Sequence, residues 1–200
     1  MKLGVKSRKW LLGGFLALAA ILLGKFMFFP TKSVPNDFVE ARSRGTEVAQ
    51  QIVALSNSVL RGISDIARYD QEGNTTEALL LVANNLVQNK KNQEQSILLA
   101  SNLERMARFV PNIKPARARQ LATAAVGAEV ALVSRLISYN DYLRQLFEVL
   151  NNKFDRGYAK SVDAEHIDLL ISKINEEAAA INNLNQRFND ALAEFDKLIK

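Results

Sequence analysis

Residues 163–199 read DAEHIDLLISKINEEAAAINNLNQRFNDALAEFDKLI, and alternating steps of three and four residues through them meet an apolar side chain at nine of ten positions. The positions are Ile167, Leu170, Ile174, Glu177, Ile181, Leu184, Phe188, Ala191, Phe195 and Leu198. An apolar seam sustained over more than four heptads is typical of a helix that packs as in a coiled coil. Glu177 is the exception, and a polar seam residue can set the register between helices.

Three further long helices are predicted upstream from their capping residues and breakers. The first opens after Pro35, and the second opens at Asn74, three residues before Glu77, an order that resembles a capping box. The third starts at Pro115 and stops before Gly157, a residue suited to ending a helix. The expected helices are 36–71, 75–109, 115–156 and 163–199. No stretch alternates as a strand would, and similar lengths with short connections predict an all-α, long antiparallel four-helix bundle with coiled-coil-like packing.

The seams of the first and third helices are mostly apolar. The first passes through Ala49, Ile52, Ser56, Val59, Ile63 and Ile66, and the third through Leu121, Ala125, Ala128, Leu132, Leu136, Tyr139, Leu143, Leu146 and Leu150. Two successive steps of four after Ala128 indicate a stutter in the third seam. The alanine-rich residues 122–128 would let a neighbouring helix, or a second copy, approach closely.

The second helix has the weakest apolar pattern. Its apolar positions Leu79, Val82, Leu86, Ile97, Leu103 and Val110 are interrupted by residues 88–96, QNKKNQEQS, which are all polar. Such a run is not expected to bury a stripe. Because neither Gly nor Pro occurs in it, we expect a continuous helix that is exposed there, with a bend or break as the alternative.

Residues 10–29 predict a transmembrane helix ahead of the bundle. WLLGGFLALAAILLG, residues 10–24, carries no charge, and about 20 largely apolar residues match a hydrocarbon core of roughly 30 Å. The anchor residues are Trp10 and Lys25 near the interfaces and Phe26, Phe28 and Phe29. Cleavage as a signal peptide after residue 19 is the alternative, but it would leave AILLGKFMFF as an apolar terminus, so an uncleaved signal-anchor is favoured.

The distribution of charge gives the anchor a predicted orientation. The chain carries a formal charge of +5, but six of its 26 Lys and Arg residues, and none of its 21 Asp and Glu residues, lie in residues 1–32. Basic residues stay on the cytoplasmic side. We therefore expect a single-pass protein of the cell membrane. Residues 1–9 would form a cytoplasmic tail, residues 30–35 a juxtamembrane linker and residues 36–200 an extracytoplasmic bundle. Since the bundle is nearly neutral, nucleic acid is not an expected partner.

The connection between the second and third helices is the candidate contact site. In an up-and-down bundle it returns to the membrane side, and it is rich in basic residues: Arg105, Arg108, Lys114, Arg117 and Arg119. We call these five residues the basic window. Anionic headgroups or an acidic membrane partner would suit it. The alternative is a solvated loop whose charges meet helix ends.

No residue pattern predicts catalysis, a metal or a cofactor. The chain has no cysteine, and His166 is its one histidine, which excludes the paired Glu-x-x-His motifs of di-iron bundles. Glu176 and Glu177 are adjacent and point in different directions on a helix. Tyr139, Asn140 and Tyr142 could line a pocket between helices, although packing at the edge of the core is the more common role.

Two functions follow as expectations. In architecture alone, the chain resembles single-anchor bundle proteins of bacterial envelopes, such as the LemA family, and the four-helix sensor domains of chemoreceptors. The first expectation is a non-enzymatic scaffold or accessory subunit that contacts membrane lipid, a protein partner or a second copy of itself. The second is an extracytoplasmic ligand-binding or sensor bundle, which polar seam residues Ser56 and Glu177 favour.

Overall fold

The structure, a computed structural model, describes residues 34–156 and 161–199, and these ranges are helical without a strand. The helices are α2 (Asn36–Glu72), α3 (Thr75–Phe109), α4 (Ala116–Arg156) and α5 (Ser161–Leu198), with a short 3-10 helix η1 (Val110–Asn112) before α4. Each long helix begins and ends within two residues of its predicted limits. The tail 1–9 and the anchor residues Trp10, Lys25, Phe26, Phe28 and Phe29 lie outside the described residues.

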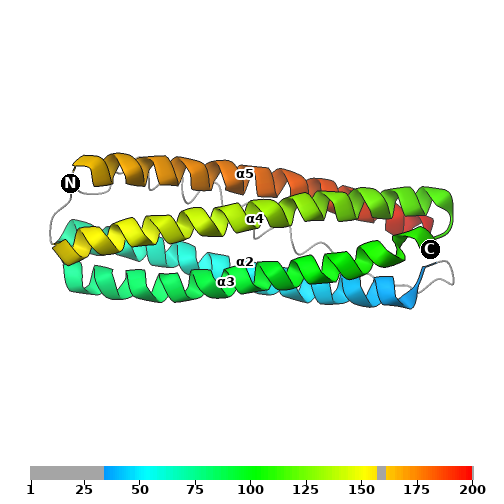
Figure 1. Cartoon of the computed structure of the whole chain (residues 1–200), viewed down its shortest axis with the longest axis horizontal. Coiled ribbons are helices and arrows are strands. Elements are labelled where there is room, and N and C mark those ends of the chain that lie inside the picture. The colour runs from blue at the N-terminus through cyan, green and yellow to red at the C-terminus, as the bar shows by residue number, and fades with distance from the viewer. Residues whose placement is uncertain (1–33, 157–160, 200) are drawn as a thin grey trace.

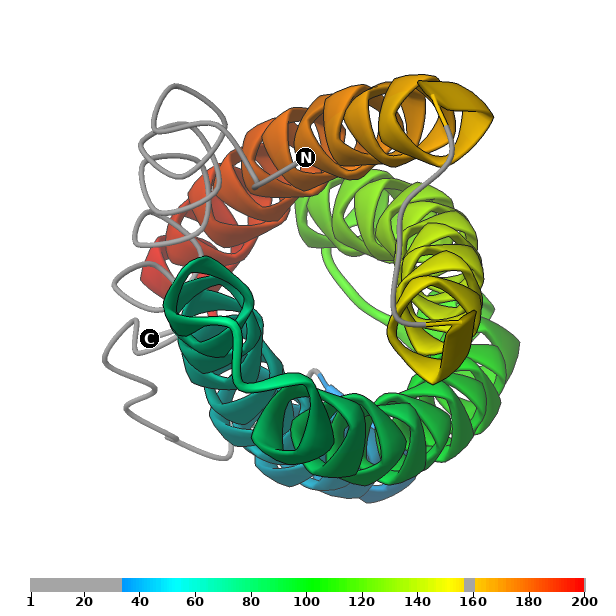
Figure 2. The ribbon, with the colours of Figure 1, turned by 90° about the vertical axis from the view of Figure 1, so that its left-hand side faces the viewer.

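The four long helices pack side by side with alternating direction, which confirms the predicted all-α four-helix architecture (Figure 1). Viewed along their length they surround a common axis (Figure 2). Backbones approach closely between α2 and α3, between α3 and α4, and between α4 and α5, whereas α2 and α5 approach each other less closely. The start of α2, η1 and the end of α5 lie together at one end of the bundle, which we call the η1 end.

Local sequence sets the junction between α2 and α3 at the opposite end. Gly73 ends α2 with φ of 76°, a left-handed conformation that glycine adopts without a steric penalty, and the Asn74 N–H donates to the Tyr69 carbonyl at 2.9 Å. The Asn74 side chain then accepts from the Glu77 N–H at 3.3 Å and caps α3, as the spacing predicted.

The core extends along the whole bundle, and six predicted seam residues of α5 are buried in it: Ile167, Leu170, Ile174, Ile181, Phe188 and Phe195. At the η1 end, the Phe195 ring lies 5.7 Å from the ring of Phe38 and joins α5 to α2. Leu198 is 45% exposed, and Leu184 and Ala191 are only partly buried, because the buried positions beside Phe188 are Asn185 and Leu192, which continue the heptad spacing of Ile171 and Ala178.

The prediction for residues 88–96 is half wrong. The helix is continuous and Lys90, Lys91, Gln93 and Glu94 are exposed, but a polar stripe of Asn89, Asn92 and Ser96 is buried. Steps of four and three meet buried residues throughout α3 and into η1: Ala78, Val82, Asn85, Asn89, Asn92, Ser96, Leu99, Leu103, Met106 and Val110. The assigned seam position Ile97 is 61% exposed. The apolar pattern did not predict this buried stripe because its middle positions are three asparagines and a serine. Hydrogen bonds inside the core offset the cost of burying these polar side chains.

The predicted stutter in α4 is also wrong. Its buried seam keeps a regular alternation of three and four through Ala122, Ala125, Glu129, Leu132, Leu136, Tyr139, Leu143, Leu146 and Leu150. Ala128, where the stutter was placed, is only partly buried. The sequence pattern favoured Ala128 as the seam residue because the regular position holds a charged residue, Glu129. In the structure Glu129 is buried, with 7% of its surface exposed.

Among the described helices, α4 is long and apolar enough to cross a membrane. Most of its large apolar side chains, however, face the other helices of the bundle, with Val130 and Ile137 exposed, and its buried seam contains Glu129 and Asn140. A core helix of a four-helix bundle has this composition, so the packing of α4 accounts for its hydropathy.

Candidate functional site

A network of side-chain amides and hydroxyls crosses the middle of the bundle. The Asn92 amide nitrogen donates to Ser56 Oγ at 2.9 Å and to Asn140 Oδ1 at 3.2 Å, and Asn89 donates to the Asn140 carbonyl at 2.7 Å. Ser96 Oγ in turn accepts from Asn140 at 3.4 Å. These bonds link α2, α3 and α4. A shift of α3 by one turn would separate the partners and leave buried amides unpaired, so the network specifies the register of the helices.

Close helix packing accompanies the network. A Cβ built on Gly62 of α2 would lie 2.1 Å from the Asn85 amide nitrogen, so glycine at this position lets α2 approach α3. The Asn85 amide itself donates to the Leu81 carbonyl at 2.8 Å. Tyr139 and Asn140 are each 1% exposed, so they belong to this filled polar core rather than to a pocket.

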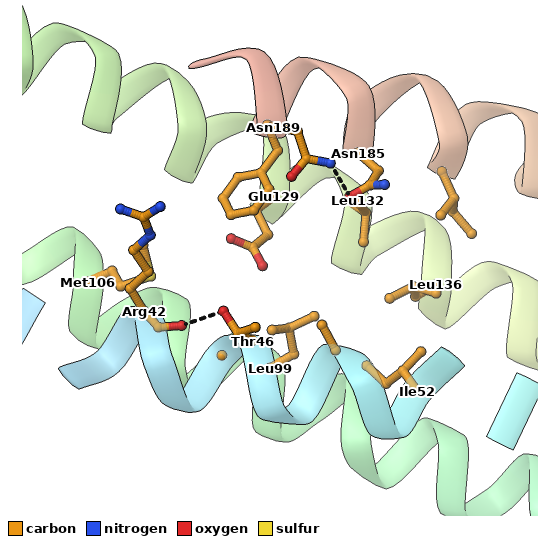
Figure 3. Close-up of a pocket in the computed structure, with 14 residues that line it drawn as sticks. Arg42, Thr46, Ile52, Leu99, Met106, Glu129, Leu132, Leu136, Asn185 and Asn189 are labelled. Carbon is orange, nitrogen blue, oxygen red and sulfur yellow. Dashed lines mark hydrogen bonds between the residues drawn. The ribbon is translucent and has the colours of Figure 1, made fainter. Parts of the chain in front are cut away.

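A cavity lies between the network and the η1 end, and side chains from all four long helices line it (Figure 3). Its apolar wall includes Ile52, Leu99, Leu132, Leu136, Ile181 and Phe188. Water-sized molecules can occupy about 30 Å³ of it, and the empty space out to its mouth is about 690 Å³. The space exists because three of the α2 residues that line it, Gly45, Thr46 and Ala49, have small side chains, and because α2 and α5 are farther apart than the other neighbouring helices.

Glu129 is the ionisable group that α4 contributes to the cavity. Its carboxylate points into the space between α4 and α2 (Figure 3), and it forms no hydrogen bond with any described residue. Burial raises the pKa of Glu129 to about 8, because the ionised form is poorly solvated there, and the nearby Arg42 guanidinium only partly offsets this effect. A carboxyl group without a partner is costly in a packed core and is common where a ligand or a proton binds.

Arg42 lies beside the cavity but is already engaged. Its two terminal nitrogens donate to the two oxygens of Asp196 at 2.6 and 2.8 Å, in a bidentate pair between α2 and α5. The Arg42 side chain is 8% exposed, so the pair is largely shielded from water. Once Arg42 and Asp196 neutralise each other, the remaining charge at the cavity is that of ionised Glu129.

Two asparagines of α5 complete the polar part of the wall. Asn189 donates to the Asn185 oxygen at 3.4 Å. Asn185 is 1% exposed, and its amide nitrogen is buried with no hydrogen-bond partner among the described residues. The wall therefore offers a carboxyl group on one side and an unused amide donor on another.

The basic window lies at the η1 end, at the same end of the bundle as the first described residues of α2. Arg105 is partly buried and the other four residues are exposed. Arg108 pairs with Glu104, and Arg117 lies 3.6 Å from Glu194. Arg105, Lys114 and Arg119 have no carboxylate within 4 Å among the described residues.

The apolar residues interleaved with the basic window are not a membrane-insertion surface. Val110 and Ile113 are 7% and 0% exposed and close the core at the η1 end, while Phe109 is partly buried against it. Any contact made by the window is therefore electrostatic.

The other sequence candidates occupy structural positions. Glu177 pairs with Arg135 at 3.3 Å across α4 and α5, whereas Glu176 is exposed, so the two carboxylates diverge as expected. His166 is exposed in the first turns of α5. Among the described residues, no group of three or more His, Cys, Asp and Glu side chains is arranged to hold a metal ion.

Sequence reasoning did not find Arg42, Glu129 and Asn185 as cavity residues. A signal was present, because Glu129 falls on the regular heptad seam of α4 and Asn185 on that of α5. A search that allowed polar residues at seam positions would have selected both.

Comparison with known proteins adds no relative: no family model, no curated protein and no solved structure matches the chain.

Proposed function

We propose that the protein is a single-pass membrane protein whose extracytoplasmic bundle acts, without catalysis, as a scaffold or accessory subunit at the membrane surface. The observation that carries the proposal is the position of the basic window: it lies at the end of the bundle where α2 begins, and only residues 30–35 separate α2 from the largely apolar residues 10–29. A chain that leaves the bilayer at residue 30 and enters α2 at residue 36 keeps this end near the headgroups.

Electrostatics support an anionic lipid surface as the first contact. Each Lys or Arg near an anionic membrane contributes roughly 1 kcal/mol, and the attraction falls off within a Debye length. The ion pairs of Arg108 and Arg117 join highly exposed side chains, so they are weak and can open when a headgroup phosphate approaches. A protein partner or a second copy would meet the exposed sides of the bundle, where Leu80, Ile97 and Val130 are more than half exposed.

Substitution of the window tests the lipid contact. We expect Arg108→Ser, Lys114→Ser, Arg117→Ser and Arg119→Ser together to weaken binding of a residue 34–200 fragment to phosphatidylserine-containing liposomes by on the order of 1,000-fold at low salt. Flotation with increasing fractions of phosphatidylserine measures the change. The expected loss shrinks at high salt because exposed charges are screened.

A charge-matched control uses Arg61, Arg68, Lys90 and Lys91, which are exposed away from the η1 end. Changing these four to serine alters net charge equally and is expected to affect binding much less. If both quadruple variants lose affinity to the same extent, net charge and not the window attracts the lipid. If neither does, the contact does not exist.

A further inference from the structure

We propose that the cavity between α2, α4 and α5 is a binding site for a small organic amine, whose ammonium group pairs with Glu129 while its apolar part lies against Ile52 and Ile181. This site goes beyond the membrane contact proposed above. It would make the protein the ligand-binding type of bundle that the sequence left as its second interpretation.

The charge of the cavity selects a cation. Arg42 is held by both oxygens of Asp196, so it is not offered to an anionic ligand. Glu129 has no hydrogen bond to any residue that the structure describes, and it points into the open space (Figure 3). An ammonium group there would give the carboxylate the charge-assisted hydrogen bonds that the protein does not supply.

The size of the cavity and its few metal-ligating groups favour an organic amine over a metal ion. A metal ion needs several carboxylate or imidazole ligands, and the described residues bring only Glu129 to this space. The wall is mostly aliphatic and aromatic, which favours an apolar body. The inner space admits only a few heavy atoms, so the ligand is small. The unused Asn185 amide can donate to an oxygen of the ligand or of a water that enters with it.

The spacing of the helices gives a route of entry. Thr46, Ala49 and Asn189 line the cavity and are only partly buried, and they come from α2 and α5, whose backbones are farthest apart among neighbouring pairs. A ligand can therefore enter between these two helices without separating the closely packed pairs.

Protonation of Glu129 links binding to pH. An ammonium ion needs the ionised carboxylate, so each ligand that binds below the pKa of Glu129, about 8, displaces one proton. Affinity should fall about tenfold for each pH unit below that pKa. The charged groups that face Glu129 are Arg42 of α2 and, bonded to it, Asp196 of α5; the lining residues of α3, Leu99 and Met106, do not titrate.

Isothermal titration calorimetry on the full-length chain in nanodiscs, with empty nanodiscs as reference, tests the proposal. The probes are n-pentylamine, 1-pentanol and pentanoate. At pH 8 we expect pentylamine to bind at least about tenfold more tightly than pentanol, and pentanoate not to bind. Glu129→Gln is expected to reduce pentylamine affinity to that of pentanol. Ala49→Leu, which fills the cavity and keeps the carboxyl group, is expected to weaken both.

Several results would overturn the amine site. Equal binding of pentylamine and pentanol would mean that the space is apolar only, and tight binding of pentanoate would assign recognition to Arg42. Absence of binding by any probe, or unchanged pentylamine affinity in Glu129→Gln, would also remove the proposal. None of the five basic-window residues lines the cavity, so each proposal can fail while the other stands.

Discussion

Replacing Glu129 by glutamine is expected to stabilise the bundle by about 4 kcal/mol near pH 9 and by less than about 1 kcal/mol near pH 5. Burial raises the pKa of Glu129 from 4.5 to about 8. Between these values the folded chain holds a proton that the unfolded chain has released, so stability falls as the pH rises. Glutamine resembles the protonated glutamic acid side chain in shape and does not ionise. The Glu129→Gln variant is therefore not expected to lose stability in this way as the pH rises.

Urea denaturation at several pH values measures the free energy of unfolding of the wild-type protein and of the Glu129→Gln variant. Subtracting one from the other cancels the contributions of other titrating groups, which both proteins share. One such group is Asp141, where hydrogen bonding to Arg144 lowers the pKa and thus supplies stability that is lost in acid. A difference that does not change between pH 5 and pH 9 would mean that Glu129 is not buried from solvent. Because the variant is expected to be the more stable protein, its loss of amine binding could not be assigned to unfolding.

Replacing Lys153 by methionine is expected to cost about 3–5 kcal/mol, because it leaves a buried carboxylate without its partner. Lys153 of α4 donates to Asp70 of α2 at 2.7 Å, and the two side chains are 8% and 9% exposed. The pair ties α2 to α4 near the end opposite η1. Thermal or urea unfolding at neutral pH measures the loss.

Two further variants separate burial of the charge from loss of the contact. Adding Asp70→Asn to Lys153→Met removes the unpaired charge and is expected to restore most of the stability. Arg144→Met breaks ion pairs with Asp141 and Glu148 in which all three side chains are about half exposed, and should cost less than about 1 kcal/mol. If the exposed and the buried pair cost the same, the Lys153–Asp70 pair is hydrated in solution.

The helices could be predicted from the sequence because their ends are marked by local chemistry. Gly73, Asn74 and Pro115 act within one turn of their own positions, and the apolar seam of α5 repeats over its whole length. Such signals need no knowledge of the neighbouring helices.

The polar core could not be predicted by a search for apolar seams. Asn89 and Asn92 are buried because Ser56 and Asn140, on other helices, supply their hydrogen-bond partners. Glu129 is buried by the packing of α4 against three neighbours, and the cavity depends on the separation of α2 from α5. These features arise from tertiary contacts, which residue spacing within one helix does not encode.

The orientation of the bundle on the membrane is the claim on which the proposed function depends, and the absence of cysteine allows a direct measurement. Single cysteines introduced as Asn112→Cys, in η1 just beyond the end of α3, and Thr76→Cys, in the first turn of α3, place fluorescent labels at opposite ends of a helix about 50 Å long. The full-length chain is placed in liposomes that contain headgroup-spin-labelled lipid. We expect strong quenching at residue 112 and little at residue 76. Equal quenching at both positions, or stronger quenching at residue 76, would contradict a bundle that stands with its η1 end on the bilayer.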